Sequence, residues 1–219
     1  METIKLLYKA VVVGNSSGAA VLTKRALSEG NGAEEVIDRA LMPAMATVGE
    51  KFKNSQIFVP EMLVAARAMK TAMSLLEPRL LAAGVTPKHT AIIGTVEGDL
   101  HDIGKNLVAI MWRGTGFRVI DLGVNVTPAG FITAIEEHLP DIVGLSAVLT
   151  TTMPAMAGTL KAIRASNCPP VKVIIGGAPV SQQFAEAIGA DAYAADAGSA
   201  ADKALELVAA GGISAFPRR

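Results

Sequence analysis

The sequence of 219 residues has a single cysteine, Cys168, and lacks any uninterrupted apolar run of the roughly 18 residues that a membrane-spanning helix needs. One cysteine cannot form an internal disulfide, so a disulfide scaffold is excluded and a reducing cytoplasm is the expected location. The first residues also lack the basic-then-apolar order of a signal peptide. We therefore expect the mean hydropathy of +0.41 to come from a buried core rather than from a membrane segment.

The sequence also lacks an excess of charge of either sign, and it has few aromatic side chains. The chain has 20 acidic and 20 basic residues, so its formal net charge is zero. No electrostatic footprint for nucleic acid or for an anionic membrane is visible, and neither is expected as a partner. Aromatic residues make up only 4% of the chain, whereas hydrophobic residues make up 51%. This composition disfavours an all-β fold and suits helices packed closely against a sheet.

The first half of the chain, residues 1–86, has the periodicity of helices joined by short loops. Such a pattern predicts a small antiparallel four-helix bundle. The expected helices are Glu2–Val13, Ser17–Glu29, Ala33–Phe52 with a kink at Pro43, and Pro60–Leu76. Glu77-Pro78 and Gly84–Lys88 mark the expected linker to the second half, because proline and glycine interrupt helices there.

The second half, residues 87–219, alternates short apolar runs of strand length with helical stretches. This alternation predicts an α/β domain with a parallel sheet flanked by helices, and five strands favour the flavodoxin-like (Rossmann-like) order 2-1-3-4-5. The expected strands are Thr90–Thr95, Phe117–Leu122, Ile142–Ser146, Val171–Ile175 and Ala192–Ala194. In this fold ligands bind beyond the carboxyl ends of strands 1 and 3, so residues that follow those two strands are expected to be neighbours.

The segment after the first expected strand contains a histidine in a distinctive setting. Asp99 lies two residues before His101, and Gly104 lies three residues after it, where a helix is expected to begin. A carboxylate can hold one ring nitrogen of a histidine and leave the other free for a metal. The local spacing alone leaves two interpretations open: a metal site, or a helix-entry loop with an exposed histidine.

Three sequence elements together resemble the fingerprint of the cobalamin-binding domain family, which is Asp-x-His-x-x-Gly, then Ser-x-Leu, then Gly-Gly. Asp99–Gly104 is the first element. Ser146-Ala-Val148 follows after 41 intervening residues, and Gly176-Gly177 after 27 more. One departure is Val148, where the family usually has leucine.

The helical half is similar to the cap bundle that precedes this domain in methionine synthase and in small methyl-carrying corrinoid proteins. Val48–Phe52 and Phe58–Glu61 carry that likeness. Val59 stands where methionine synthase has leucine, and a smaller side chain there bears on how tightly the cap closes over a ligand. Phe52 and Val59 are the cap residues expected to face the cofactor.

The resemblance implies a cobalamin bound with its own base off the cobalt and with His101 as the lower axial ligand. Asp99 would accept a hydrogen bond from the other ring nitrogen, and the family implies that Ser146 extends this chain to the carboxylate. Thr150 and its neighbours could hydrogen-bond the displaced nucleotide tail, although helix capping is the alternative for them. The full set of expected cofactor-binding residues is Asp99, His101, Asp102, Ile103, Gly104, Ser146, Val148, Thr150, Gly176, Gly177, Phe52 and Val59.

Two of these positions keep a structural alternative. Asp102 also suits an acidic residue in the first turn of a helix, where the helix dipole favours negative charge. Gly176-Gly177 also suits a plain turn after the fourth strand. The resemblance implies that both glycines leave room for the close approach of a backbone or a ligand.

The resemblance implies a methyl-carrying corrinoid protein, cycling between methylcobalamin and cob(I)alamin. A donor-specific methyltransferase would load the methyl group, a second methyltransferase would pass it to tetrahydrofolate or a thiol, and a reductive activating protein would restore the cofactor. The chain would be the carrier subunit of this system, without a complete activity alone. A cobalamin-dependent regulator or sensor is an alternative, but the N-terminal half lacks a basic recognition helix. The cobalamin subunit of an adenosylcobalamin mutase is another, disfavoured by the methyl-type cap.

Overall fold

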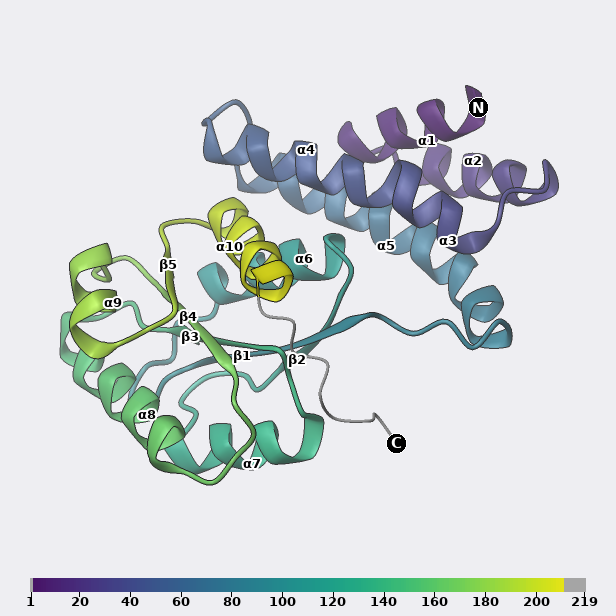
Figure 1. Cartoon of the computed structure of the whole chain (residues 1–219). Helices are drawn as coiled ribbons and strands as arrows, with labels where there is room; N and C mark the ends of the chain where they lie inside the picture. The colour runs from purple at the N-terminus through teal and green to yellow at the C-terminus, as the bar shows by residue number, and fades with distance from the viewer. Residues whose placement is uncertain (1, 211–219) are drawn as a thin grey trace. The chain divides into compact units, whose positions relative to one another are not determined.

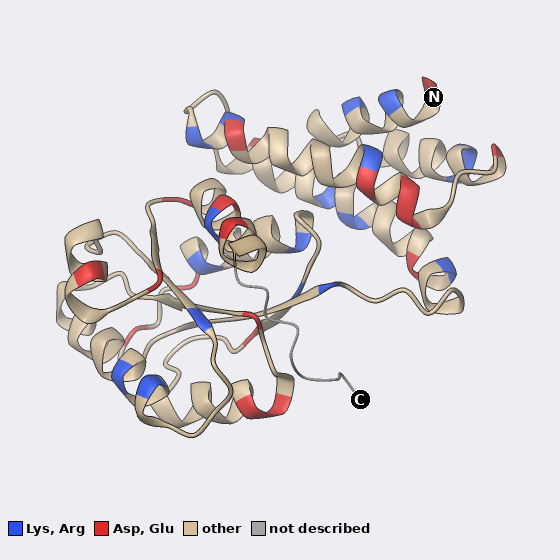
Figure 2. Ribbon diagram, viewed as in Figure 1, with Lys and Arg blue, Asp and Glu red and all other residues tan. Residues whose placement is uncertain are grey.

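The computed structural model describes residues 2–210. The chain divides into two compact units (Figure 1). The first contains the residues through Lys88 together with Gly114–Gly116, and the second contains His89–Arg113 and the residues from Phe117 onward. Within residues 2–210, no helix combines the length and the apolar character that crossing a bilayer requires. Acidic and basic residues are interspersed along both units rather than gathered by sign (Figure 2).

The first unit is built from helices joined by short loops, as the sequence predicts. In chain order they are α1 (Glu2–Val12), α2 (Ser16–Ser28), α3 (Ala33–Val36), a π-helical turn (Ile37–Leu41), α4 (Met42–Lys53) and α5 (Val59–Ala82). The largest fully buried side chains of this unit are Leu7, Leu41, Met45, Met62 and Leu76. Burial of each such side chain contributes about 1.5–3 kcal/mol, which explains why short helices hold together here.

The predicted kink at Pro43 takes the form of a π-helical turn that ends just before the proline. The backbone N–H of Met42 donates to the carbonyl oxygen of Ile37, five residues back. In a regular α-helix, the ring of Pro43 would collide with a carbonyl of the preceding turn. The wider turn leaves Pro43 in the first turn of α4, where a helix does not need the missing N–H.

Helix α5 is longer than the sequence suggests, because it runs past Leu76 to Ala82 with Pro78 inside it. The prediction that Glu77-Pro78 begins the linker was therefore wrong. Pro78 lies close to the C-terminal end, where the loss of one backbone hydrogen bond disrupts few following turns. The helix ends at Ala82, and just beyond it Gly84 has a φ of 69°, which lets the N–H of Val85 donate to the carbonyl oxygen of Leu80 at 2.9 Å.

The second unit is a five-stranded parallel sheet with helices on both faces (Figure 1). Its strands are β1 (His89–Thr95), β2 (Phe117–Asp121), β3 (Ile142–Ser146), β4 (Lys172–Gly176) and β5 (Ala192–Ala194). Its helices are α6 (Ile103–Gly114), α7 (Pro128–His138), α8 (Met153–Ala165), α9 (Gln182–Ile188) and α10 (Ala197–Ala210), with a short 3-10 turn at Thr150–Thr152. The strand order β2-β1-β3-β4-β5 confirms the predicted flavodoxin-like topology.

Two strand glycines allow the helices to approach the sheet closely. A Cβ on Gly94 of β1 would lie 2.8 Å from the ring of Phe131 in α7, and a Cβ on Gly144 of β3 would lie 2.7 Å from the ring of Trp112 in α6. Trp112 is fully buried, and its indole N–H donates to the carbonyl oxygen of Ala200 at 2.9 Å. Since side chains alternate along strands, α6 and α7 cover opposite faces of the sheet.

The strand register aligns the three sequence elements of the predicted site. Thr95 of β1 pairs with Ser146 of β3, and Ser146 pairs in turn with Gly176 of β4. The strands are parallel, so the segments that leave these three residues start side by side at the carboxyl edge of the sheet. This edge is where the fold positions the candidate site.

The opposite, amino edge of the sheet is held by a partly buried carboxylate. Asp191 accepts hydrogen bonds from the backbone N–H of Val173 at 2.8 Å and from the ammonium group of Lys172 at 3.0 Å, and it pairs with Arg164. Burial raises the pKa of Asp191, but these donors and cations outweigh it, so its pKa lies below the ordinary value. The group is therefore a source of pH-dependent stability.

The variant Asp191→Asn is expected to lower the free energy of unfolding at pH 7 by about 1–3 kcal/mol. A carboxylate with a lowered folded-state pKa contributes stability that is fully present above its unfolded-state pKa, near 4, and is lost as the pH falls through the folded-state pKa. The difference between the native protein and the variant should therefore shrink below about pH 4. Urea unfolding of both proteins between pH 3 and pH 7 measures it, and a difference independent of pH would contradict this account.

Candidate functional site

The predicted metal-binding loop connects β1 to α6 at the carboxyl edge of the sheet. It folds back onto the strand that it leaves: the hydroxyl of Thr95 donates to the carbonyl oxygen of His101 at 2.8 Å, and the N–H of Asp99 donates to the carbonyl oxygen of Val96 at 3.2 Å. These two hydrogen bonds fix the middle and the end of the loop to Thr95 and Val96, at the carboxyl end of β1. The histidine is therefore carried by an ordered loop on a rigid element.

Asp99 is completely buried and is the centre of the site. Its Oδ1 accepts from the N–H of His101 at 3.0 Å and faces the ring Nδ1 of His101 at 2.7 Å. Its Oδ2 accepts from the N–H of Val148 at 2.7 Å and from the hydroxyl of Thr152 at 2.8 Å. Burial raises the pKa of Asp99, but these four hydrogen bonds outweigh the burial and hold the pKa well below its usual range.

The ionised carboxylate determines the tautomer of His101. A carboxylate only accepts hydrogen bonds, so Nδ1 must carry the ring hydrogen, and in the neutral ring Nε2 then keeps its lone pair. The side chain of His101 is 52% exposed, and no residue in the described part of the chain hydrogen-bonds Nε2. Nε2 is therefore a nitrogen donor that is available to a metal.

The protein offers this metal one ligand rather than a set. No group of three or more histidine, cysteine, aspartate or glutamate side chains suited to a metal ion occurs within residues 2–210. A metal bound at His101 must therefore bring most of its ligands with it, as the metal of a macrocyclic cofactor does. A single imidazole would fit the cobalt of a corrinoid, whose macrocycle would supply further nitrogen ligands.

Large exposed apolar side chains lie next to the histidine in the chain and next to the residue whose N–H binds Asp99. Leu100 and Ile103 are each 72% exposed, and Leu149, next to the Val148 N–H that binds Asp99, is 42% exposed. Apolar side chains gathered around a polar donor indicate a ligand site, since such groups gain by being covered. Ile103 was among the predicted site residues. Leu100 and Leu149 were not, although an apolar residue inserted between Asp99 and His101 in a loop is a signal that could have identified the first of them.

The three predicted glycines differ in what they accommodate. A Cβ on Gly104 would meet no atom within 4 Å, so the packing of the protein does not require glycine at this exposed position. A Cβ on Gly177 would lie 1.9 Å from the carbonyl oxygen of Ala147, and φ at Gly177 is 130°. A Cβ on Gly176 would lie 2.9 Å from the carbonyl oxygen of Ala194. Gly176 and Gly177 are therefore required by the packing of the strand ends themselves.

Ser146 does not make the hydrogen bond that the resemblance implies. Within the described residues Asp99 receives no bond from Ser146, and the hydroxyl donor on its carboxylate is Thr152. Ser146 is the last residue of β3, where its carbonyl oxygen accepts from the N–H of Val96 at 3.0 Å. The 3-10 turn after β3 then brings Thr152 back to Asp99. The Thr152 hydroxyl also lies 2.9 Å from the carbonyl oxygen of Leu149, but the ionised carboxylate is the stronger acceptor.

The remaining predicted residues lie at the border of the loop site or in the other unit. Asp102 is exposed and accepts from the side-chain amide of Asn106 at 3.1 Å; it immediately precedes α6 rather than lying in its first turn, where the sequence alternative placed it. Thr150 is exposed in the 3-10 turn. Phe52 lies in the last turn of α4, and Val59 is the first residue of α5, so both belong to the helical unit.

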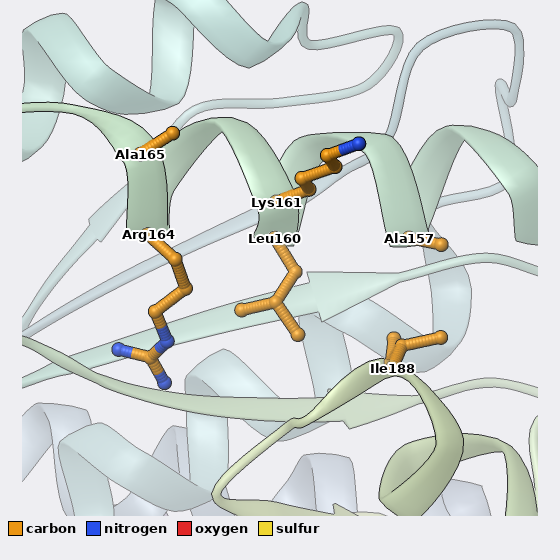
Figure 3. A pocket seen from close by; sticks show the side chains of 6 residues that line it. All are labelled: Ala157, Leu160, Lys161, Arg164, Ala165 and Ile188. Carbon is orange, nitrogen blue, oxygen red and sulfur yellow. The ribbon is translucent and has the colours of Figure 1, made fainter.

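A hollow of about 530 Å³ between α8 and α9 is not part of this site (Figure 3). It is lined by Ala157, Leu160, Lys161, Arg164, Ala165 and Ile188. Its Arg164 is already engaged, because the guanidinium donates to the carbonyl oxygen of Val171 at 2.8 Å and pairs with Asp191. None of the predicted site residues contributes to it.

Comparison with known proteins agrees with this chemistry. A family model described as a B12 binding domain matches residues 89–206, and a second one with the same description matches residues 3–77. A corrinoid protein of Desulfitobacterium hafniense is 35% identical over 211 residues, which cover 94% of this chain and 96% of that protein. Monomethylamine corrinoid protein 2 of Methanosarcina acetivorans is 37% identical over 212 residues, which cover 94% of this chain and 98% of that protein.

Solved structures show a similar fold over most of the chain. The methanol:cobalamin methyltransferase complex of Methanosarcina barkeri matches with a TM-score of 0.84 and 28% identity, over 96% of this chain and 81% of the matched one. A cobalamin-binding protein of Desulfitobacterium hafniense matches with a TM-score of 0.79 and 30% identity, over 94% of this chain and 98% of that one. The chain belongs to the family of cobalamin-binding corrinoid proteins of methyltransferase systems.

Proposed function

We propose that this protein binds cobalamin with His101 as the lower axial ligand of cobalt and carries a methyl group between two methyltransferases. The observation that carries the proposal is the pairing of His101 with Asp99: Nδ1 lies 2.7 Å from a buried carboxylate oxygen, while Nε2 has no protein partner in the described residues. When bound, the corrinoid supplies a cobalt centre that can take up a methyl group and give it away.

The chain's own residues orient His101 as a ligand and offer an apolar surface that would exclude water from it. Asp99 holds the ring of His101 in one tautomer and one orientation, so that Nε2 presents its lone pair. Leu100, Ile103 and Leu149 offer apolar surface that a corrin ring would cover, and Gly104 leaves space for its approach.

The proposed methyltransferase partner is supported by the relatives, whereas the second methyltransferase and the activating protein rest on the family resemblance of the sequence. A donor-specific methyltransferase loads the methyl group, a second methyltransferase passes it to tetrahydrofolate or a thiol, and a reductive activating protein restores the cofactor. Similar proteins are named for monomethylamine and for a methanol:cobalamin methyltransferase complex, which supports a small methylated amine or alcohol as the donor. In this system the chain is the carrier subunit. The roles of Phe52, Val59 and Thr150 stay predictions from the sequence.

The axial ligand is tested by electron paramagnetic resonance of the Co(II) form, in protein labelled with ¹⁵N-histidine. A histidine nitrogen on cobalt splits each line into a doublet when it is ¹⁵N, whereas the unlabelled base of the cofactor would give a triplet. We expect doublets in the native protein and their complete loss in His101→Ala.

His138→Ala provides the matched control, because His138 lies at the C-terminal end of α7 beside Glu137 and outside the loop site. This variant should keep the doublets. Triplets in the labelled native protein, or doublets that persist in His101→Ala, would rule out His101 as the lower ligand. Transfer to cobalt from methylamines or methanol, in the presence of candidate methyltransferases, tests the carrier function separately.

A further inference from the structure

Lys105 is a buried lysine in the first turn of α6. It is 3% exposed, and its ammonium nitrogen lies 2.6 Å from both carboxylate oxygens of Asp121 and 2.7 Å from the side-chain oxygen of Asn106. Lysine is almost never fully buried unless it is paired. The positive end of the helix dipole further disfavours a cation at this place. The stability of α6 therefore does not explain why a lysine is buried in its first turn.

The stability of the whole fold does not account for it either. Taking the charge of Lys105, whose side chain is 2% exposed, out of water costs several kcal/mol, and its attraction to the Asp121 carboxylate, which is 28% exposed, repays this only when the geometry is good. Buried ion pairs can often be replaced by apolar side chains of similar volume without loss of stability. A role for the ion pair is indicated instead by the two segments that it joins.

The pair connects the carboxyl end of β2 to the residue that follows Gly104. Asp121 is the last residue of β2, and its Oδ1 also accepts from the N–H of Gly123 at 2.9 Å, which fixes the carboxylate to its own loop. Lys105 lies in the first turn of α6, three residues after Asp102, the last residue of the histidine loop. The ion pair therefore holds the end of the histidine loop against the neighbouring strand.

The loop after β2 holds the beginning of the same segment. The N–H of Asn125 donates to the carbonyl oxygen of Asp99 at 3.0 Å, and its side-chain oxygen accepts from the N–H of Gly98 at 2.8 Å. Asn125 has a φ of 55°, a left-handed conformation that asparagine tolerates better than most residues. The segment that carries His101 is thus held at both ends, Gly98 and Lys105, from the β2 side.

A short relay leads from the ion pair to the residue next to the histidine. The side-chain oxygen of Asn106 accepts from Lys105, so its amide NH₂ is turned the other way and donates to Asp102 at 3.1 Å. Lys105 therefore orients Asn106, and Asn106 orients Asp102. Asp102 adjoins His101 in the chain.

We propose that Lys105 and Asp121 form a positioning pair for His101, which sets the fraction of bound cofactor whose cobalt carries the histidine. This inference rests on the proposed function. Neither residue acts on the metal: they restrict the loop so that Nε2 is presented in one orientation. Without the pair the loop samples more conformations, and the ratio of histidine-bound to histidine-free cofactor is expected to fall about tenfold.

The test uses Lys105→Met/Asp121→Leu, a double variant that removes both charges and so leaves no unpaired cation in the core. Asp121→Asn is the second variant, which keeps the shape of the side chain and an oxygen for Lys105. The full-length ¹⁵N-histidine-labelled proteins are loaded with cobalamin and reduced to the Co(II) form. The ratio of ¹⁵N-split to unsplit resonance signal is then measured, together with the urea midpoint of each protein.

We expect the double variant to keep its midpoint and lose about tenfold in this ratio, and Asp121→Asn to change in the same direction by less. An unchanged ratio in the folded double variant overturns the proposal. If the double variant does not fold, an unchanged ratio in Asp121→Asn overturns it.

A control pair separates positioning from stability. Lys172→Met/Asp191→Asn removes an ion pair of 3.0 Å at the amino edge of the sheet, away from the loop. It should lower the midpoint and leave the ratio unchanged, and an equal fall in the ratio would assign the effect to stability. If the native protein shows no ¹⁵N splitting, the proposed function fails and this inference with it. Splitting that is equal in the native protein and the double variant removes this inference alone.

Discussion

Asp99→Asn is expected to weaken cobalamin binding about 10- to 100-fold and to destabilise the fold at the same time. The reason lies in the four donors around the carboxylate. Each of its oxygens accepts from a backbone N–H, Oδ1 from His101 and Oδ2 from Val148. An asparagine has one oxygen and one NH₂ group. Whichever way the amide is turned, its NH₂ group faces a backbone N–H that cannot accept.

The size of both effects follows from the burial of Asp99, which is completely covered. A buried N–H without an acceptor costs about 1–3 kcal/mol, and bonds to a charged group are worth more than neutral ones, so a loss of about 3 kcal/mol in the free energy of unfolding is expected. For His101, a neutral amide is a weaker acceptor for the Nδ1–H. Nε2 then becomes a poorer ligand, and its ring is less firmly oriented.

Titration of the apo-protein with cobalamin measures the affinity, and urea unfolding measures the stability. Glu97→Gln is the matched control, because Glu97 is an exposed carboxylate in the same loop and makes no hydrogen bond in the described residues. It should change neither quantity. An Asp99→Asn protein that binds cobalamin with native affinity would show that the carboxylate does not support the ligand.

The order of strands and helices could be predicted because it follows from local patterns. Strands buried on both faces appear as short apolar runs, as in Ile142–Ser146, and the helices between them keep a helical period. The predicted strand ends at Thr95 and Ser146 agree with the structure. The placement of the site followed from these ends, because a parallel sheet of this order has its ligand crevice there.

The partners of buried polar groups could not be predicted in the same way. Thr152 binds Asp99 because the chain turns back after β3, and Lys105 is buried because Asp121 lies across from it at the end of β2. Both contacts join residues that the fold brings together over long separations in the chain. A lysine in the first turn of a helix looks like an exposed residue in the sequence, and only the opposing carboxylate makes its burial possible.

Gly177→Ala is expected to destabilise the protein by about 4 kcal/mol, enough to prevent folding of a marginally stable domain. The new Cβ would lie 1.9 Å from the carbonyl oxygen of Ala147 and 2.8 Å from its carbonyl carbon. The φ of 130° at this position adds strain for any residue with a Cβ. The clash is with backbone rather than with a side chain, so no rotamer change relieves it.

Neither backbone can move away without loss. The N–H of Ala147 donates to the carbonyl oxygen of Gly176 at 3.2 Å, and the N–H of the adjacent Val148 binds Asp99 at 2.7 Å. A shift at Gly177 therefore reaches the carboxylate that holds His101. Thermal unfolding of the purified variant measures the loss, and native stability in Gly177→Ala would contradict the geometry described for this turn.

Gly104→Ala is the informative counterpart, because a Cβ at Gly104 meets nothing within 4 Å in the protein. Alanine in the first turn of α6 should leave the stability unchanged or raise it by up to about 1 kcal/mol, since alanine favours helix. Cobalamin binding should nevertheless weaken, because the methyl group occupies space that the cofactor needs beside His101. Loss of binding without loss of stability would separate a glycine kept for the ligand from one kept for the fold, whereas native affinity in Gly104→Ala would place the corrin elsewhere.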